Sequence, residues 1–205
     1  NISLVNPSMP FNFTVYSPSS GIINNNRFNL NMTASKEVTN ITYINYNDRS
    51  PRMSKLCEEC SEYGNTQKKT KILNEGVNNI TITAIDNFGN VVSENLLIIV
   101  DTKKPFIKST FPLRGFGLGN FSVVFFDENT ISLSLIVAND TITRTFPVNI
   151  SVCTKNKYYE CDIMVNLGEF NGGQVRYNFN LTDIAGKSTL SRTRLITIDE
   201  TPPQI

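Results

Sequence analysis

Hydrophobic and polar residues alternate over short stretches through most of the chain, with the period of two that a half-buried β-strand shows. Arg27–Thr33 and Asn40–Tyr46 place apolar side chains on one face and Asn or Thr on the other, and Val148–Cys153 also reads as a strand. Phe121–Phe126 is apolar on both faces, which is typical of a central strand. Residues 47–70 are polar and poorly periodic, and no stretch of about 11 residues has a helical period. The pattern predicts an all-β fold of short strands and turns, as in a β-sandwich.

One segment of the chain occurs twice. Ile80–Ile107 and Tyr177–Ile205 both contain a strand pattern, an Asx-Gly turn, a second strand pattern and an Asp-x-x-x-Pro exit. The turn reads Asp-x-x-Gly in both copies, at Asp86–Gly89 and at Asp183–Gly186. A repeat of this kind indicates that one structural unit is present twice.

The repeat predicts two β-sandwich domains, residues 1–101 and 102–205, the second ending in a Pro-containing linker. Thr201–Ile205 corresponds to Thr102–Ile107, which leads into the first strand of the second half. Proline fixes φ and biases the preceding residue toward extended geometry, so such a linker forms a stiff joint. The expected partners are therefore further copies of the repeat or neighbouring domains of a longer chain.

Composition argues against an enzyme and against a nucleic-acid-binding protein. The net charge is +1, so bulk electrostatics gives a polyanion no attraction. The sequence has no histidine, which is the commonest general base and metal ligand. The carboxylate pairs Glu58-Glu59 and Asp127-Glu128 lie in polar stretches without an apolar pocket to shift a pKa. We find no catalytic constellation or cofactor motif, and no apolar run of about 18 residues that would span a membrane.

Nine Asn-x-Ser/Thr sequons are present, and several of them sit in strand patterns. In Asn31-Met32-Thr33, for example, the Asn and the Thr share the polar face while the Met points the other way. This placement predicts N-linked glycans at several sites, the alternative being that Asn and Thr serve only as uncharged surface residues. The candidate acceptors are Asn1, Asn12, Asn31, Asn40, Asn79, Asn120, Asn139, Asn149 and Asn180.

The four cysteines form two local pairs, Cys57 with Cys60 and Cys153 with Cys161. A shared zinc site would need both pairs, but they belong to different predicted domains and no histidine supplements them. A thioredoxin-like centre would need a βαβ pattern around Cys57, which is missing. The favoured interpretation is two local disulfides, Cys57–Cys60 and Cys153–Cys161, in an oxidising extracellular setting.

Four aspartates recur at the ends of the predicted domains: Asp86, Asp101, Asp183 and Asp199. An Asp at the start of a turn accepts hydrogen bonds from its own backbone, and this explains them without a metal. Calcium is the alternative, but only one or two carboxylates approach each junction, which is fewer than a tight calcium site uses. We therefore predict no cofactor, with calcium as the one ion for which candidate ligands exist.

Two motifs carry a resemblance to a known class of proteins. The pattern L-x-E-G-x-N-x-I-x-I-x-A-x-D-x-x-G-N at Leu73–Asn90, followed by V-D-T-x-x-P at Val100–Pro105, resembles Ig-like or fibronectin-III-like repeats of prokaryotic cell-surface proteins. The cysteine patterns LCEEC and C-x7-C are similar to those of such repeats in archaea. The second copy departs from the pattern at Lys187, where Asn is usual. The resemblance implies two tandem Ig-like β-sandwich domains.

The resemblance also implies a structural repeat unit of an extracellular, glycosylated cell-surface protein, of the filament or surface-layer type, that extends or self-associates outside the cell. An adhesin or receptor-binding stalk is one alternative, and a non-catalytic spacer of a secreted enzyme is another. Exposed aromatic side chains would favour the adhesin, and the available loop aromatics are Phe111, Phe116, Tyr158 and Tyr159.

Overall fold

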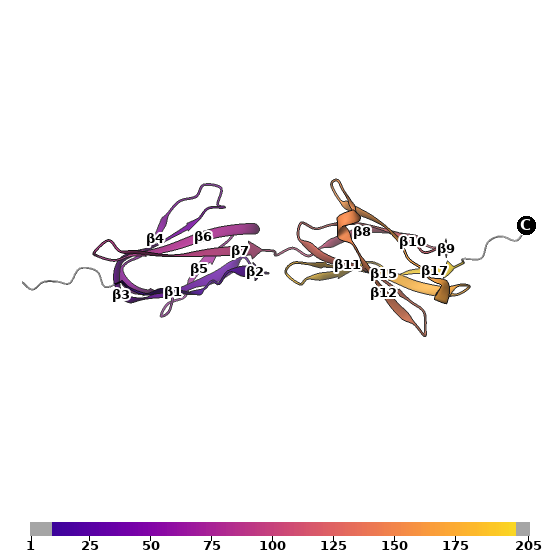
Figure 1. Ribbon diagram of the computed structural model, residues 1–205, viewed down its shortest axis with the longest axis horizontal. Helices are drawn as coiled ribbons and strands as arrows, with labels where there is room; N and C mark the ends of the chain where they lie inside the picture. Colours follow the sequence, from indigo (N-terminus) through magenta and orange to yellow (C-terminus); the bar gives the residue numbers. More distant parts are fainter. Residues whose placement is uncertain (1–9, 200–205) are drawn as a thin grey trace, which may run out of the picture. The chain divides into compact units, whose positions relative to one another are not determined.

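The computed structural model describes residues 10–199 and confirms an all-β fold (Figure 1). The sequon at Asn1 and the linker at Thr201–Ile205 lie outside the described residues. The chain divides into two compact units, Asn1–Thr102 and Lys103–Ile205, here called unit 1 and unit 2. Each unit has its own hydrophobic core.

The strands of unit 1 form one hydrogen-bonded sheet in the order β1-β3-β6-β7-β2, and β4 and β5 also pair with β3. Their bounds are β1 (Phe13–Ser17), β2 (Gly21–Ile23), β3 (Arg27–Asn45), β4 (Ser54–Tyr63), β5 (Lys69–Ile72), β6 (Gly76–Ile85) and β7 (Val91–Val100).

The long strand β3 belongs to both layers of unit 1. Its first part pairs with β1 and β5, and its second part pairs with β6. Buried side chains fall on even positions up to Val38 and on odd positions from Ile41. The pairing with β4 shifts register between Thr33 and Val38 and again between Ile41 and Thr42, on either side of this switch. A switch of inward face of this kind is the signature of β-bulges, which bend a strand. One continuous strand thereby lines the core from both sides.

Unit 2 is built from two separate sheets, a four-stranded one in the order β13-β14-β10-β8 and a six-stranded one in the order β12-β11-β15-β17-β9, with β16 on β15. The strands are β8 (Phe106–Phe111), β9 (Phe116–Gly117), β10 (Asn120–Phe126), β11 (Thr130–Ala138), β12 (Thr143–Val148), β13 (Thr154–Lys155), β14 (Tyr159–Met164), β15 (Gln174–Asp183), β16 (Ser188–Leu190) and β17 (Arg194–Ile198). Two 3-10 turns, η1 (Ile150–Val152) and η2 (Gly168–Phe170), lie between strands.

Both units use the same crossover at their beginning. In unit 1 the chain leaves β1, passes a cis peptide bond at Ser17–Pro18 and forms β2 at the far end of the same sheet. In unit 2 it leaves β8 of the four-stranded sheet, passes a cis peptide bond at Phe111–Pro112 and joins the six-stranded sheet as β9. There β2 pairs in parallel with β7, and β9 pairs in parallel with β17 (Figure 1). Gly21 and Gly115 follow the proline at the same distance, and both have positive φ, which glycine adopts without strain. Unit 2 therefore repeats the plan of unit 1 strand by strand at this edge.

Two sequence-based expectations about strands were wrong. Residues 54–63 form β4 although their sequence is not periodic, because β4 follows the bend of β3 and its side chains do not alternate regularly between inside and outside. The predicted strand Val148–Cys153 is interrupted by η1, because the Asn149 side chain accepts a hydrogen bond from the Ser151 N–H and starts a 3-10 turn.

Candidate functional site

The turn between β6 and β7 is organised by the buried carboxylate of Asp86. Oδ1 accepts hydrogen bonds from the backbone N–H groups of Phe88 and Asn90, both at 2.9 Å. Oδ2 accepts from Asn90 Nδ2 at 2.9 Å and lies 2.7 Å from Lys36 Nζ. Burial opposes ionisation of Asp86, but the hydrogen bonds from Lys36 and Asn90 outweigh it and hold the pKa of this carboxyl below its usual range. The side chain thus serves the turn.

Asp183 occupies the matching position between β15 and β16. The backbone bonds are those of the first turn, with Asp183 N–H donating to Lys187 O and Gly186 N–H donating to Asp183 O. Asp183 Oδ1 accepts from Lys187 N–H at 2.7 Å. The buried Oδ2, however, has no hydrogen-bond partner among the described residues. Lys187 replaces Asn90, so the amide that bonds Oδ2 in unit 1 is missing in unit 2.

The other two aspartates end the last strand of each unit. Asp101 N–H donates to Ile23 O at 2.9 Å, and Asp199 N–H donates to Gly117 O at 3.3 Å. These bonds continue the parallel pairing of the crossover strands. Within residues 10–199, no three His, Cys, Asp or Glu side chains gather in a way that could hold a metal ion.

The acidic pairs singled out in the sequence also have local roles. Asp127 is buried at the end of β10, where its Oδ2 accepts hydrogen bonds from Asn129 N–H and Thr130 Oγ1–H. Glu58 lies in β4, not in a loop, and pairs with Lys55 at 2.8 Å on the surface. Asp127 and Glu58 therefore each bind a partner within three residues in the sequence.

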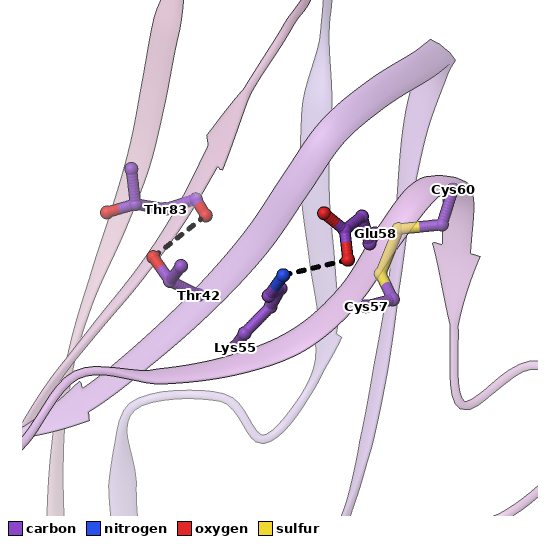
Figure 2. Close-up of a disulfide and its surroundings, with 6 residues drawn as sticks. All are labelled: Thr42, Lys55, Cys57, Glu58, Cys60 and Thr83. Atoms are coloured by element: carbon purple, nitrogen blue, oxygen red, sulfur yellow. Dashed lines mark hydrogen bonds and ion pairs between the residues drawn. A yellow bond between two sulfur atoms is a disulfide. The ribbon is translucent and has the colours of Figure 1, made fainter.

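The predicted disulfide Cys57–Cys60 is confirmed and lies within β4 (Figure 2). Cys60 is paired with Val38 and Cys57 with Ile41, so the disulfide lies between the two register shifts of the β3–β4 ladder. Glu59, between the two cysteines, has a φ of 47°, in the left-handed region that non-glycine residues seldom occupy. The disulfide therefore links two residues of β4 that lie opposite the point at which β3 changes its inward face.

The predicted disulfide Cys153–Cys161 is also confirmed and joins neighbouring strands. Thr154 pairs with Glu160 across β13 and β14, which makes the two cysteines the next directly opposed pair. Their Cα atoms are 4.5 Å apart, and Cys161 is buried in the core of unit 2. This bridge ties the segment that contains η1 to the four-stranded sheet.

Burial divides the sequons in the described residues into two groups. Asn12, Asn79, Asn120 and Asn149 are exposed, whereas Asn31, Asn40, Asn139 and Asn180 are half-buried. In the second group the Oδ1 atoms of Asn31 and Asn40 are buried without a hydrogen-bond partner, and Asn139 Oδ1 accepts bonds from Thr141 and Ile142. Alternation correctly placed these side chains on the polar face, but it carried no information on how closely neighbouring strands cover them.

Four of the apolar side chains exposed on unit 2 lie close together in one segment. Phe111–Leu118, here called the crossover segment of unit 2, exposes Phe116 by 73% and Leu118 by 65%, and it also exposes Phe111 and Leu113. Tyr158 and Tyr159, by contrast, are half-buried. No helix in residues 10–199 is long and apolar enough to cross a bilayer.

No protein-family model and no curated protein matches this chain. Among solved structures, it is similar to a tetra-tandem repeat in the extending region of a large adhesion protein, with a TM-score of 0.51 and 14% identity over 93% of this chain. The match covers 49% of that structure, so this chain spans about half its length.

A three-Ig fragment of titin (TM-score 0.42, 16% identity, 93% of this chain and 65% of that chain) and the FN1–FN3 domains of chicken CNTN1 (TM-score 0.38, 12% identity, 94% and 67%) are also similar. The likeness to the adhesion-protein repeat shows the fold, which is that of tandem Ig-like or fibronectin-III-like β-sandwich domains.

Proposed function

We propose that this chain is a non-catalytic, structural repeat pair of an extracellular cell-surface protein from a prokaryote, of the archaeal filament or surface-layer type. In this role it extends the protein away from the cell or associates with further copies, and it carries N-linked glycans. The observation that carries the proposal is the repeated plan: two units share the crossover strand, the Asp-capped turn and a closing aspartate.

Two local disulfides support an extracellular setting, because such bonds persist where the environment is oxidising. Each disulfide closes a short loop beside the core, so it stabilises a unit against loss of local structure. A structural repeat outside the cell is exposed to proteases and to mechanical shear, and stabilisation of this kind suits that role.

The crossover segment of unit 2 supports association with a neighbouring domain. Its exposed apolar side chains lie beside the last strand of the unit, because Phe116 pairs with Thr197 and Gly117 with Ile198. In unit 1 the corresponding segment is Ser17–Asn24, in which Asn24 stands in the place of Leu118. Contiguous exposed apolar side chains of this kind mark protein–protein contacts.

Electron microscopy of the native full-length protein tests the assembly directly, and ordered filaments or lattices are the expected result. The companion experiment replaces Phe116 by Ser and Leu118 by Asn, and follows association by sedimentation velocity. We expect the double variant to remain dispersed at concentrations at which the parent protein associates. Ile72→Ser, which changes an exposed apolar residue on β5, is the matched control and should leave association unchanged. Monomers at every concentration, for parent and variant alike, would refute self-association.

An adhesive stalk is the second candidate, and the same exposed segment favours it. Aromatic side chains such as Phe116 are enriched where proteins contact other proteins. Binding of the isolated full chain to foreign cells, lost in the Phe116→Ser variant and without ordered self-assembly, would select this second function.

A further inference from the structure

A shallow groove of about 340 Å³ lies on the outer face of the four-stranded sheet of unit 2. We call it the Asn120 groove. Its lining residues are Phe111, Asn120, Phe121, Ser122, Asp162, Ile163 and Met164. The groove runs across β8, β10 and β14, which are neighbours in the sheet in the order β14-β10-β8.

The strand pattern of β10 decides which side chains face the groove. Phe121 is buried in the core, whereas Asn120 and Ser122 point outward on either side of it. Ser122 is paired with Phe111 on one neighbouring strand, and Asn120 is paired with Met164 on the other. Directly paired residues share a face of the sheet, so the outward pair on β10 has an aromatic wall on one side and a thioether wall on the other.

Both walls are unusually accessible. Phe111 is 59% exposed and Met164 is 81% exposed, although neither is charged or polar. Between them the groove offers three polar side chains, Asn120, Ser122 and Asp162. An apolar lining with a few converging polar groups is the usual character of a ligand groove, so the site suits a ligand that has both apolar and hydroxyl faces.

Asn120-Phe121-Ser122 is itself a glycosylation sequon, and its acceptor Asn and its hydroxyl residue both line the groove. We propose that the Asn120 groove holds the first sugar rings of an N-linked glycan attached to Asn120. The inference rests on the proposed function, because it requires that this chain be glycosylated. The C–H face of a pyranose ring packs on Phe111 and Met164, since aromatic and thioether groups both accept such contacts.

The charge of the groove restricts the class of sugar. Asp162 is the only ionisable residue among those that line it, and a carboxylate accepts hydrogen bonds from hydroxyl donors. An acidic sugar would bring a second negative charge to this site. The proximal sugars are therefore neutral pyranoses that direct hydroxyl groups toward Asp162.

Attachment of the glycan transfers an oligosaccharide from a lipid carrier to the side-chain amide of Asn120. The C1–O bond between the sugar and the phosphate of a lipid-linked oligosaccharide breaks, and a C1–N bond forms with Asn120 Nδ2. One amide proton passes to a base of the oligosaccharyltransferase, and the lipid phosphate leaves with the bonding electron pair. Asn120 is exposed, which leaves its amide accessible for this step.

A second sequon provides an internal contrast. Asn149 and Ser151 line another groove of unit 2, of about 540 Å³. There the Asn149 Oδ1 atom accepts the Ser151 N–H at 3.0 Å and caps η1, so the acceptor amide is already part of a turn. Asn120 is in a regular strand and lies between two exposed apolar walls, so we assign the groove-bound glycan to Asn120 and not to Asn149.

Oxidation of Met164 by peroxide tests whether the glycan lies in the Asn120 groove, because a sugar packed on the thioether slows its conversion to the sulfoxide. The full-length protein is purified from its native host, and occupancy of Asn120 is read by glycopeptide mapping. The oxidation rate of Met164 is measured relative to that of the exposed Met53 in unit 1, which serves as the internal reference. We expect Asn120 to be occupied and Met164 to be oxidised severalfold more slowly than in Asn120→Gln made in the same host.

A matched pair of variants separates packing from mere attachment. Phe111→Ala keeps the sequon but removes the aromatic wall, and should restore the fast oxidation of Met164 while Asn120 stays occupied. Phe106→Ala changes another exposed Phe on β8 outside the groove, and should leave Met164 protected. Each variant is also made in a host without N-glycosylation, where Met164 should be oxidised at one rate in all of them.

Two results would overturn the inference. One is an unmodified Asn120 in native material while other sequons are occupied, which leaves the proposed glycoprotein intact. The other is an occupied Asn120 with equal Met164 oxidation in the native chain and in Asn120→Gln, which means that the glycan extends into solvent. If no sequon is occupied, the glycoprotein part of the proposed function fails together with this inference.

Discussion

Unit 1 and unit 2 follow one strand plan but connect their two layers differently. In unit 1, β3 passes from one layer to the other without interruption, whereas in unit 2 β10 ends and β11 begins at a turn capped by Asp127. Beside the passage in unit 1, Lys36 reaches the buried Asp86. Beside the turn in unit 2, Ile184 N–H donates to Asn129 O. The turn capped by Asp86 in unit 1 and by Asp183 in unit 2 is thus common to both units, while the connection between the layers beside it differs.

The two cores also differ in the kind of side chain that fills them. The largest fully buried side chains are aliphatic in unit 1, with Ile41 and Ile82 as examples, and aromatic in unit 2, with Phe125 and Phe179 as examples. Phe125 stacks on Tyr159, with ring centroids 5.1 Å apart. The strand plan therefore constrains where apolar residues lie more strongly than which apolar residues they are.

Substitutions in the two cores should have the largest effect on the free energy of unfolding, and each should act on one unit only. Phe125→Ala should lower the free energy of unfolding of unit 2 by about 4 kcal/mol, and Ile82→Ala should lower that of unit 1 by about 3 kcal/mol, because both remove fully buried side chains. Differential scanning calorimetry should show that each variant shifts one transition. If either substitution shifts both transitions equally, the two units are not independent in stability.

Acidification should act on unit 1 through Asp86. The folded-state pKa of Asp86 is lowered, so its stabilising contribution is present above the unfolded pKa of about 3.9 and is lost as pH falls from there toward the folded pKa. We expect the midpoint of unit 1 to fall steeply below about pH 4 in the parent protein and less steeply in Asp86→Asn. Equal slopes in the two proteins would contradict a role for the ionised carboxylate.

The two disulfides should contribute unequally to the free energy of unfolding of their units. From loop-closure entropy, removal of Cys153–Cys161 as a double Ser variant should cost unit 2 about 2.5 kcal/mol, and removal of Cys57–Cys60 should cost unit 1 about 2 kcal/mol. Urea unfolding under non-reducing conditions measures both values, and a fully reduced sample of the parent protein is the control. A larger loss at Cys57–Cys60 would mean that the backbone conformation of Glu59 between the two cysteines matters more than loop length.

A smaller effect of opposite sign is expected at the turn of unit 2. Lys187→Asn should stabilise unit 2 by about 1 kcal/mol, because the new amide is placed to donate to Asp183 Oδ2 as Asn90 does to Asp86. Lys187→Ala removes the same lysine without supplying a donor and is the matched control. Equal effects of the two substitutions would show that the unpaired oxygen carries no cost.

Much of the fold follows from alternation alone, which correctly placed Leu30 and Met32 toward the core. It failed where hydrogen bonding outside the ladder took over, as at the Asn149 cap. It failed again in β4, where a bent partner strand removes the regular period. The cysteine pairs were predicted correctly because both are local in sequence, so their partners required no knowledge of the tertiary structure.

The candidate site was less accessible from the sequence. The sequons were visible as motifs, but only the cross-strand register places Phe111 and Met164 on either side of Asn120. Register depends on long-range pairing between β8, β10 and β14, and no local pattern encodes it. For the crossover segment of unit 2, the sequence did single out Phe111 and Phe116 as candidate aromatics, but their exposure became known only from the fold.

The parallel pairing at the crossover has a mechanical consequence. When tension pulls a unit by its two ends, parallel strands such as β2 and β7 are drawn in opposite directions along their length. All hydrogen bonds between them then carry load together, in shear, instead of opening one after another. Three residue pairs join β2 to β7, from Gly21–Ile98 to Ile23–Val100, and two join β9 to β17. Under force applied to the ends, unit 1 should therefore resist extension longer than unit 2.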